Sequence, residues 1–298
     1  MIAMDQPSNP LGIIRSSSKA LTATSKNFAE LRTQITDIYS QRTSLLKELR
    51  AAKSKLGLLT FVHFCSYPLI FGFFYKGIAE SRVKQQAIIR QLEDRLSETY
   101  VTIKFADASQ LEKSWLNCLD TFEELAHSVK IWDLTYAESI DRVKARTTAD
   151  TSFKRTAIKY APKDIEIIKT DVKPIFIPNA NGPDVFVYPT FLILFKDNQR
   201  FGIFDLKEVK CSLSYSSFQE EEKVPNDGEV IGQTWKKANK DGSRDKRFQG
   251  NNYQIPIVRY GKLIFETDDG LQESYMFSNA EAFTGFAEAL GFHLKHLK

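Results

Sequence analysis

The chain has 298 residues, of which 42% are hydrophobic and 26% are charged. These values are typical of folded globular proteins and argue against a wholly disordered chain. The 41 basic and 37 acidic residues leave a net charge of +4, which is too balanced for a protein that binds nucleic acid through bulk charge alone. The length suits two modest domains.

The cysteine and histidine content excludes several kinds of site. The three cysteines, Cys65, Cys118 and Cys211, lie far apart, so the sequence predicts neither a disulfide framework nor a cysteine-ligated zinc site. This cysteine usage fits a reducing cytosol. Among the four histidines, His293 and His296 are expected at a solvated helix end, because two histidines do not complete a zinc site. We therefore expect no metal and no cofactor.

Charge and proline content divide the chain. Seven of the ten prolines follow residue 160, and proline is costly inside helices, so the first half is predicted to be helical and the second half to consist of strands and turns. No secretory signal peptide is expected, because no apolar stretch lies close enough to residue 1. The predicted divisions are a flexible tail over 1–25, a helical coiled-coil region over 26–145, a basic connector over 146–164, and a β domain over 165–298.

Apolar residues in the helical region follow a heptad pattern. Their spacing alternates between three and four, with Arg42 in one otherwise apolar position, and this spacing predicts paired coiled-coil arms. The alternative is a pair of ordinary amphipathic helices within one bundle. A further amphipathic helix is expected over 108–145. The heptad positions are Phe28, Leu31, Ile35, Ile38, Leu45, Leu49, Ala52 and Leu56, and then Ile89, Leu92, Leu96, Thr99 and Ile103.

An apolar segment, residues 56–75, separates the two arms and carries no formal charge over 20 residues. A continuous helix of this length would extend ~30 Å, the thickness of a bilayer's hydrocarbon core. Basic residues flank both sides, which favours a helical hairpin whose tip enters one leaflet at the cytosolic face of the inner membrane. The alternatives are a spanning helix and a tip buried in an oligomer or against a partner protein. The phenylalanines expected at this tip are Phe61, Phe64, Phe71, Phe73 and Phe74.

The second half contains short apolar runs bounded by turn residues, followed by one amphipathic helix from Asn279 to about Leu290. The sequence therefore predicts an α+β protein, in which a small antiparallel β-barrel or sandwich is capped by the last helix. Predicted strands are 164–170, 185–196, 201–209, 211–218, 229–236, 254–259, 262–267 and 274–277. Asp197-Asn198 and Asp269-Gly270 are typical of hairpin turns.

The order of these elements over 165–295 resembles that of pleckstrin-homology-like (PH-like) domains, including the bacterial and GRAM types. The segment Thr234–Leu263, and to a smaller extent the motif KIWDLT, is similar to segments of uncharacterised bacterial proteins. The resemblance implies a binding domain and brings no established activity.

Two places in the second half offer candidate sites. Asp184, in the sequence Pro183-Asp184, and Asp205 and Lys207 on a hydrophobic strand have the residue types of PD-(D/E)xK nucleases. In those enzymes two carboxylates hold Mg²⁺ and the lysine contacts the phosphate or the water. This spacing also occurs in ordinary turns.

The second place is the long loop Lys236–Asn252, which is usually the mark of a functional or a disordered segment. Its cations are expected to bind an anionic lipid headgroup, a nucleic acid or an acidic protein. The alternative is a solvated hairpin excursion. The candidate binding residues are Trp235, Lys236, Lys237, Lys240, Arg244, Lys246, Arg247 and Tyr253.

These observations favour a non-enzymatic binding or scaffold protein. We expect it to be cytoplasmic or to lie on the cytosolic face of the inner membrane. We also expect it to associate with a membrane or with itself through its helical arms while carrying a PH-like recognition domain. The alternatives are a nucleic-acid-binding protein or Mg²⁺-dependent nuclease, and a soluble subunit of an oligomer whose apolar tip is a protein interface.

Overall fold

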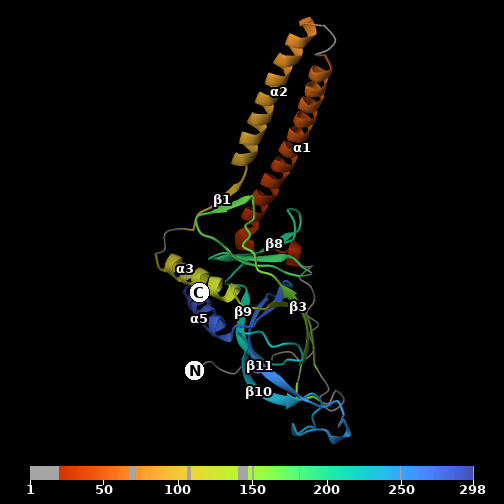
Figure 1. Cartoon of the computed structure of the whole chain (residues 1–298). Coiled ribbons are helices and arrows are strands. Elements are labelled where there is room, and N and C mark those ends of the chain that lie inside the picture. Colours follow the sequence, from red (N-terminus) through yellow and green to blue (C-terminus); the bar gives the residue numbers. More distant parts are fainter. Residues whose placement is uncertain are drawn as a thin grey trace. The chain divides into compact units, whose positions relative to one another are not determined.

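The computed structural model describes residues 20–66, 72–105, 109–139, 147–149, 151–180, 182–248 and 250–297 (Figure 1). The fold is α+β, as predicted. The chain forms two compact units. The helical unit comprises residues 29–104 and 165–171, and the sheet unit comprises residues 1–28, 105–164 and 172–298.

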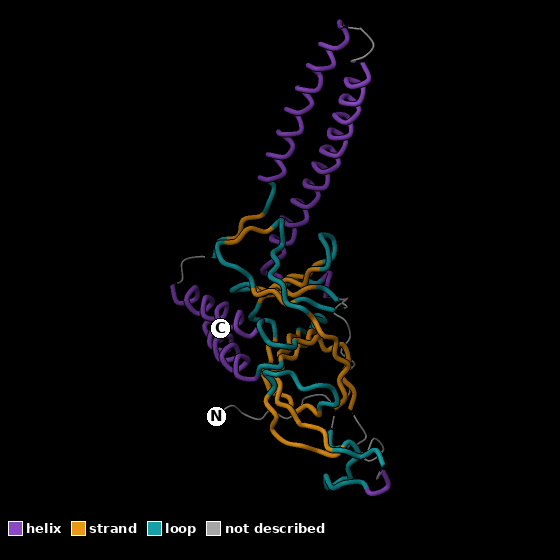
Figure 2. Tube along the Cα trace, viewed as in Figure 1, coloured by secondary structure: helices purple, strands orange, loops and turns teal. Residues whose placement is uncertain are grey.

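The helical unit is built on α1 (Ala29–Ser66) and α2 (Gly72–Glu98), which pack antiparallel over much of their length (Figure 2). Their seam buries apolar residues at the predicted heptad positions, and Gln85 Nε2 donates a hydrogen bond to the carbonyl of Ala52 across it (3.1 Å). Below the helices, β1 (Val101–Ile103) pairs in parallel with β4 (Ile168–Thr170). The buried seam residues are Leu45, Leu49, Ala52, Ile89 and Leu92.

Arg42, the polar residue in the heptad pattern, caps the end of α2. Its Nη1 donates to the carbonyls of Leu96 (2.9 Å) and Thr99 (3.0 Å), and its Nη2 forms an ion pair with Glu166. The last carbonyls of a helix have no partner inside the helix, and a cation there also interacts favourably with the helix dipole. The break in the heptad pattern therefore has a structural reason.

The sheet unit contains a small antiparallel sheet with the order β5 (Ile175–Ile177), β6 (Asp184–Val187), β7 (Phe191–Phe195) and β8 (Phe201–Asp205). The segment 20–28 lies along β8. Thr24 forms a parallel bridge with Ile203, and Ala20 and Leu21 are buried in the core. The expectation that residues up to 25 form a flexible tail is therefore wrong for 20–25, because this segment adds backbone pairing and apolar contacts to the edge of the sheet.

A larger sheet has the order β10 (Glu229–Trp235), β11 (Gln254–Glu266), β12 (Gln272–Phe277), β2 (Ile131–Ser139) and β3 (Thr151–Ile158). Strands β10 and β12 pair with successive halves of one edge of β11, and the strand β9 (Lys210–Gln219) pairs with its opposite edge. Among the described residues, no backbone pairing closes either sheet into a barrel. The antiparallel sheets are as predicted; the turn at Gly270, which has a positive φ of 96°, also agrees with the sequence.

Several predicted elements need correction. The helix expected over 108–145 is α3 (Ser109–Ala126), and β2 follows it. Ile131, Trp132, Asp133 and Leu134 are all buried because both faces of β2 are covered, so the alternation typical of strands is absent. The expected connector over 146–164 contains β3, and the strand expected over 164–170 is only β4.

The strand boundaries also differ from the predictions. The single strand expected over 185–196 is two strands, β6 and β7, because the chain turns at Tyr188–Thr190, where the Tyr188 amide donates to the carbonyl of Phe191. The two strands expected over 254–267 are the continuous β11. Strand β5 was not predicted.

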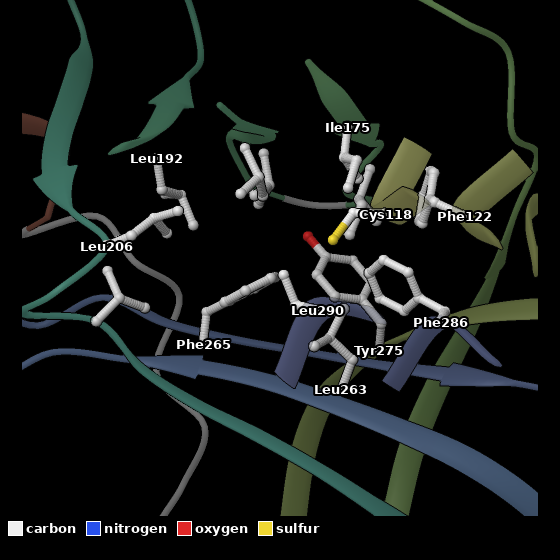
Figure 3. Packing of buried hydrophobic residues seen from close by; sticks show 14 of the residues in the cluster. Cys118, Phe122, Ile175, Leu192, Leu206, Leu263, Phe265, Tyr275, Phe286 and Leu290 are labelled. Atoms are coloured by element: carbon white, nitrogen blue, oxygen red, sulfur yellow. The ribbon is translucent and has the colours of Figure 1, made fainter. Parts of the chain in front are cut away.

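The main core lies where both sheets meet α3 and α5 (Ala280–Leu297). Cys118 and Phe122 of α3 and Phe286 and Leu290 of α5 surround the ring of Tyr275 from β12 (Figure 3). These are positions of the predicted apolar stripes, or lie beside them. The core therefore explains why both helices are amphipathic.

His293 is part of this core. It is fully buried, its Nε2 lies 2.7 Å from the carbonyl of Pro189, and its Nδ1 lies 2.8 Å from Ser114 Oγ. Burial lowers its pKa. The expected solvated helix end is therefore wrong for His293, because α5 continues to Leu297 and turns this residue inward.

A smaller core on the opposite face of the large sheet surrounds a buried ion pair. The Arg155 guanidinium on β3 lies 4.4 Å from the ring centre of Trp132 and 4.3 Å from that of Phe218, and its Nη2 contacts Glu220 Oε1 at 2.7 Å. Glu220 also accepts a hydrogen bond from Tyr260 (2.9 Å). Side chains thus join β3 to the end of β9.

Candidate functional site

The nuclease residues do not converge. Asp184 begins β6 and is level with Phe195 on β7 and Phe201 on β8, whereas Asp205 ends β8 four residues farther on. Across the sheet, two strand spacings separate the two residues by roughly 10 Å. Along the strands, four residues separate them by a further ~13 Å. Two carboxylates that share a metal must lie on one cleft, so the predicted Mg²⁺ site is not formed.

Each nuclease residue has a structural role instead. Asp184 pairs with Lys163 (2.8 Å), and Asp205 Oδ2 accepts a hydrogen bond from Asn27 Nδ2 (2.9 Å). The backbone amide of Lys207 donates to Asp205 Oδ1 (2.9 Å), while the Lys207 side chain is exposed. Asp205 therefore fixes the segment 20–28 on β8.

Other enzyme chemistry finds little support within the described residues. No cluster of three or more histidine, cysteine or acidic side chains there has the arrangement to hold a metal ion. Burial raises the pKa of both the Cys118 and the Cys211 thiol to about 12, so neither is a thiolate nucleophile at neutral pH. A space of about 290 Å³ in the helical unit is lined by Arg42, Glu93, Glu166 and Lys169, whose charges balance.

The predicted binding loop 236–252 is an ordered structure with its own hydrogen bonds. The Asn252 side chain is buried, accepts from the Lys237 amide (3.0 Å), and donates to the carbonyls of Lys237 (2.7 Å) and Asp245 (3.2 Å). Gly242 has a positive φ of 83°, which a tight turn requires. The loop joins the antiparallel strands β10 and β11 and many of its residues are exposed, so these hydrogen bonds order a hairpin excursion.

Several predicted binding cations have partners within the protein. Lys236 pairs with Glu221 (2.7 Å), and the Arg244 guanidinium lies 5.0 Å from the ring centre of Trp235. Arg247 forms a two-pronged contact with the buried Asp245, since its Nε and Nη2 each lie 2.9 Å from a carboxylate oxygen. One edge of the guanidinium, formed by Nε and Nη2, is therefore already occupied.

Lys240 and Lys246 are the exposed loop cations for which the described part of the chain provides no ion pair. Lys237 is half-buried, and Tyr253 is half-exposed beside Lys236. The structure thus separates two groups among the eight predicted residues. One group has partners within the protein, and a smaller group faces solvent.

This separation predicts different effects for two neighbouring charge reversals. Arg247→Glu should lower the melting temperature by several degrees, because the buried Asp245 loses its cation and gains a repelling charge. Lys246→Glu should leave the melting temperature within about a degree of the wild type, since exposed charge changes rarely affect stability. Thermal denaturation of both variants measures this. Equal melting temperatures would show that the Asp245–Arg247 contact does not hold the loop.

The far end of the helix pair has a seam of mixed polarity and an apolar outer surface. We define the outer end as residues 57–64 of α1 and 77–85 of α2. Continuing the heptad register places His63 of α1 and Arg82 and Gln85 of α2 in the seam, and Arg82 Nη1 lies 3.2 Å from His63 Nδ1. The same register also places the half-buried Leu59 and Ile78 in the seam, so the seam of the outer end is mixed, whereas farther down the pair its buried side chains are mainly apolar.

Large apolar side chains of the outer end face solvent instead. Leu58 is 63% exposed, Phe61 65%, Val62 41% and Phe64 77%. Of the other predicted tip residues, Phe71 lies outside the described residues, and the side chains of Phe73 and Phe74 are not described. Leu58 and Val62 were not singled out from the sequence, but the continued heptad register shows that both lie off the seam.

Comparison with known proteins adds no identity, because no family model, curated protein or solved structure matches this chain. No helix within the described ranges is sufficiently long and apolar to cross a membrane. The ordered loop and the apolar outer end therefore remain the two candidate sites, and they are judged on their chemistry alone.

Proposed function

We propose that this protein is a non-enzymatic scaffold that associates with the surface of a lipid membrane through the outer end of its helix pair. The observation that supports this proposal most directly is the exposure of Leu58, Phe61, Val62 and Phe64 beside the polar contact between Arg82 and His63. Large contiguous apolar surfaces on soluble proteins mark sites of interaction. The Arg82–His63 contact turns polar groups inward, an arrangement that suits an apolar environment outside the pair.

The distribution of these side chains favours lipid over a single protein partner. At ~100° per residue, the four apolar residues cover about 160° of the surface of α1. A docked helix or sheet covers a narrower stripe, whereas lipid contacts every outward side. Transfer of two phenylalanine side chains from water into the membrane interface contributes about 3–6 kcal/mol.

In this proposal α1 and α2 form a coiled-coil hairpin on the cytosolic side, and the sheet unit is a PH-like recognition domain. The buried heptad seam supports the first part, and antiparallel strands followed by α5 support the second. Lys240 and Lys246 are the loop residues best placed to meet an anionic partner of that domain.

Vesicle flotation of the full chain tests the membrane association. Phe61→Asp/Phe64→Asp should reduce the partition coefficient onto phospholipid vesicles by at least 100-fold, since this removes two aromatic anchors from the membrane and adds two charges. Phe248→Asp is the matched control, because Phe248 is also an exposed phenylalanine but lies in the loop of the sheet unit. It should bind vesicles like the wild type.

Two results would contradict the proposal. If the wild-type chain does not float with vesicles and Phe61→Asp/Phe64→Asp converts an oligomer into a monomer, the outer end is an interface between copies of the chain. If the double variant binds vesicles as strongly as the wild type, the outer end is not the membrane contact.

A further inference from the structure

We infer that the membrane surface bound by the outer end is anionic, and that cations surrounding the apolar side chains recognise its phosphate-bearing headgroups. This inference rests on the proposed function and names the lipid class. It is carried by the position of the charges along α1 and α2 and by the exposure of Lys55 and Lys84.

Charge is distributed unevenly along the helix pair. Residues 51–66 and 72–87 contain five cations and one acid, a net charge of 5 − 1 = +4. The remaining residues, 29–50 and 88–104, contain seven cations and six acids, a net charge of 7 − 6 = +1. The cations of the first group are Lys53, Lys55, Lys76, Arg82 and Lys84, and its acid is Glu80. The excess positive charge thus lies beside the apolar side chains.

The spacing places two of these cations at the depth of the headgroups. Lys55 precedes Phe61 by six residues, which is ~9 Å along a helix. The hydrogen bond from Gln85 to Ala52 puts Lys84 of α2 close to the level of Lys55. With Phe61 and Phe64 at the hydrocarbon boundary, the backbone of both lysines lies just outside the phosphate region, whose thickness on each side is roughly 5–8 Å, and their long flexible side chains let the ammonium groups extend into it.

Ion pairing and distance from Phe61 distinguish Lys55 and Lys84 from the other cations of the helix pair. Lys53 pairs with Glu93 (2.8 Å) and Arg82 contacts His63, whereas Lys55 and Lys84 are exposed. Lys47 is 14 residues from Phe61, a distance of ~21 Å, which is more than two Debye lengths at physiological ionic strength. Lys47 and Arg90 are exposed cations on the same two helices and are therefore matched controls.

The experiment measures binding of the full chain to two kinds of vesicle, phosphatidylcholine alone and phosphatidylcholine with about 30% phosphatidylglycerol. A single cation near an anionic surface changes the partition coefficient by about five-fold. The wild type should therefore bind the anionic vesicles at least ten-fold more strongly, and added salt should reduce this preference. Lys55→Glu/Lys84→Glu should abolish the preference, and Lys47→Glu/Arg90→Glu should retain it.

Lys55→Gln/Lys84→Gln provides a second variant, in which the preference for anionic vesicles should fall without added repulsion. Thermal denaturation checks that each variant is folded.

Equal wild-type binding to both vesicles would overturn the inference and leave the proposed function standing. Equal loss of preference in the two Glu variants would also overturn it, because the charges beside Phe61 would then have no special role. Absence of binding to either vesicle would overturn the proposed function and this inference together. Inorganic phosphate added at high concentration should not compete, and full competition would assign the site to free phosphate.

Discussion

Gly261→Ala is expected to lower the free energy of unfolding by about 3 kcal/mol or more, at the upper end of the range for overpacking in a core. A Cβ at this position would lie 2.1 Å from Cγ of Phe283 and 2.6 Å from its Cβ. Phe283 is fully buried and contacts the rings of Tyr215 and Phe277, so it has no free space into which to move. Strand β11 and helix α5 would have to separate.

Thermal denaturation measures this effect. For a domain of this size, 3 kcal/mol corresponds to a fall of roughly 6–12 °C in melting temperature. Gly285→Ala is the control, because a Cβ there meets only Thr121 at 3.9 Å and alanine favours the helix by about 1 kcal/mol. It should be neutral or stabilising. Similar melting temperatures for both variants would show that β11 and α5 do not pack this closely.

Arg155→Ala is expected to destabilise the protein by about 3–5 kcal/mol, because it leaves the carboxylate of Glu220 buried without its cation. Arg155 also contributes its contacts with the rings of Trp132 and Phe218. The double variant Arg155→Met/Glu220→Gln should be much less destabilised than the sum of its single changes, since the buried charge is removed with its partner. Urea denaturation of the single and double variants gives the coupling free energy.

The effect of pH provides an independent check on this ion pair. Burial alone would raise the pKa of Glu220, but hydrogen bonds from Arg155, from the Glu222 amide and from Tyr260 outweigh it and lower the pKa. The stabilisation by Glu220 is therefore present above its ordinary pKa and is lost as the pH falls through the lowered value. In Arg155→Ala the pKa of Glu220 should rise above its ordinary value, so the stability difference from the wild type should begin to narrow as the pH falls through that raised pKa and should be smallest below the lowered pKa of the wild type.

Lys236→Ala, which breaks the exposed pair with Glu221, should leave the unfolding midpoint nearly unchanged at any of these pH values. If Arg155→Ala behaves like Lys236→Ala, the pair with Glu220 does not support the fold. If the difference in free energy of unfolding between Arg155→Ala and the wild type stays constant with pH, Glu220 is not the group left unpaired.

Periodicity predicted the elements whose burial is one-sided. The heptad spacing identified Leu45, Leu49 and Ala52 as seam residues of α1, and the stripe containing Phe283 and Phe286 identified α5. These predictions are confirmed because a helix with one buried face repeats apolar residues every three or four positions. The antiparallel sheets were predicted for a related reason, since turn residues separate their short apolar runs.

Periodicity failed where burial is two-sided or where pairing is distant in sequence. Both faces of β2 are covered, so Ile131–Leu134 lacks alternation, and the segment 20–25 is polar apart from residues at its start. For the candidate sites, residue types alone could not show that Arg247 is held by Asp245, or that Asp184 and Asp205 lie at opposite ends of a sheet. The polar seam positions of the outer end could have been predicted by continuing the heptad register, which places His63 and Arg82 in the seam.

The docking of residues 20–28 on β8 also determines the order in which the protein can fold during synthesis. Asn27 contacts Asp205, a residue 178 positions later. At about 5–20 residues per second, the ribosome needs roughly 10–35 s to add the missing partner. Throughout this time Ala20 and Leu21 have no core to enter, whereas the neighbouring helices can begin to pair as soon as residue 98 emerges. Residues 20–28 are thus translated long before the strand that fixes them.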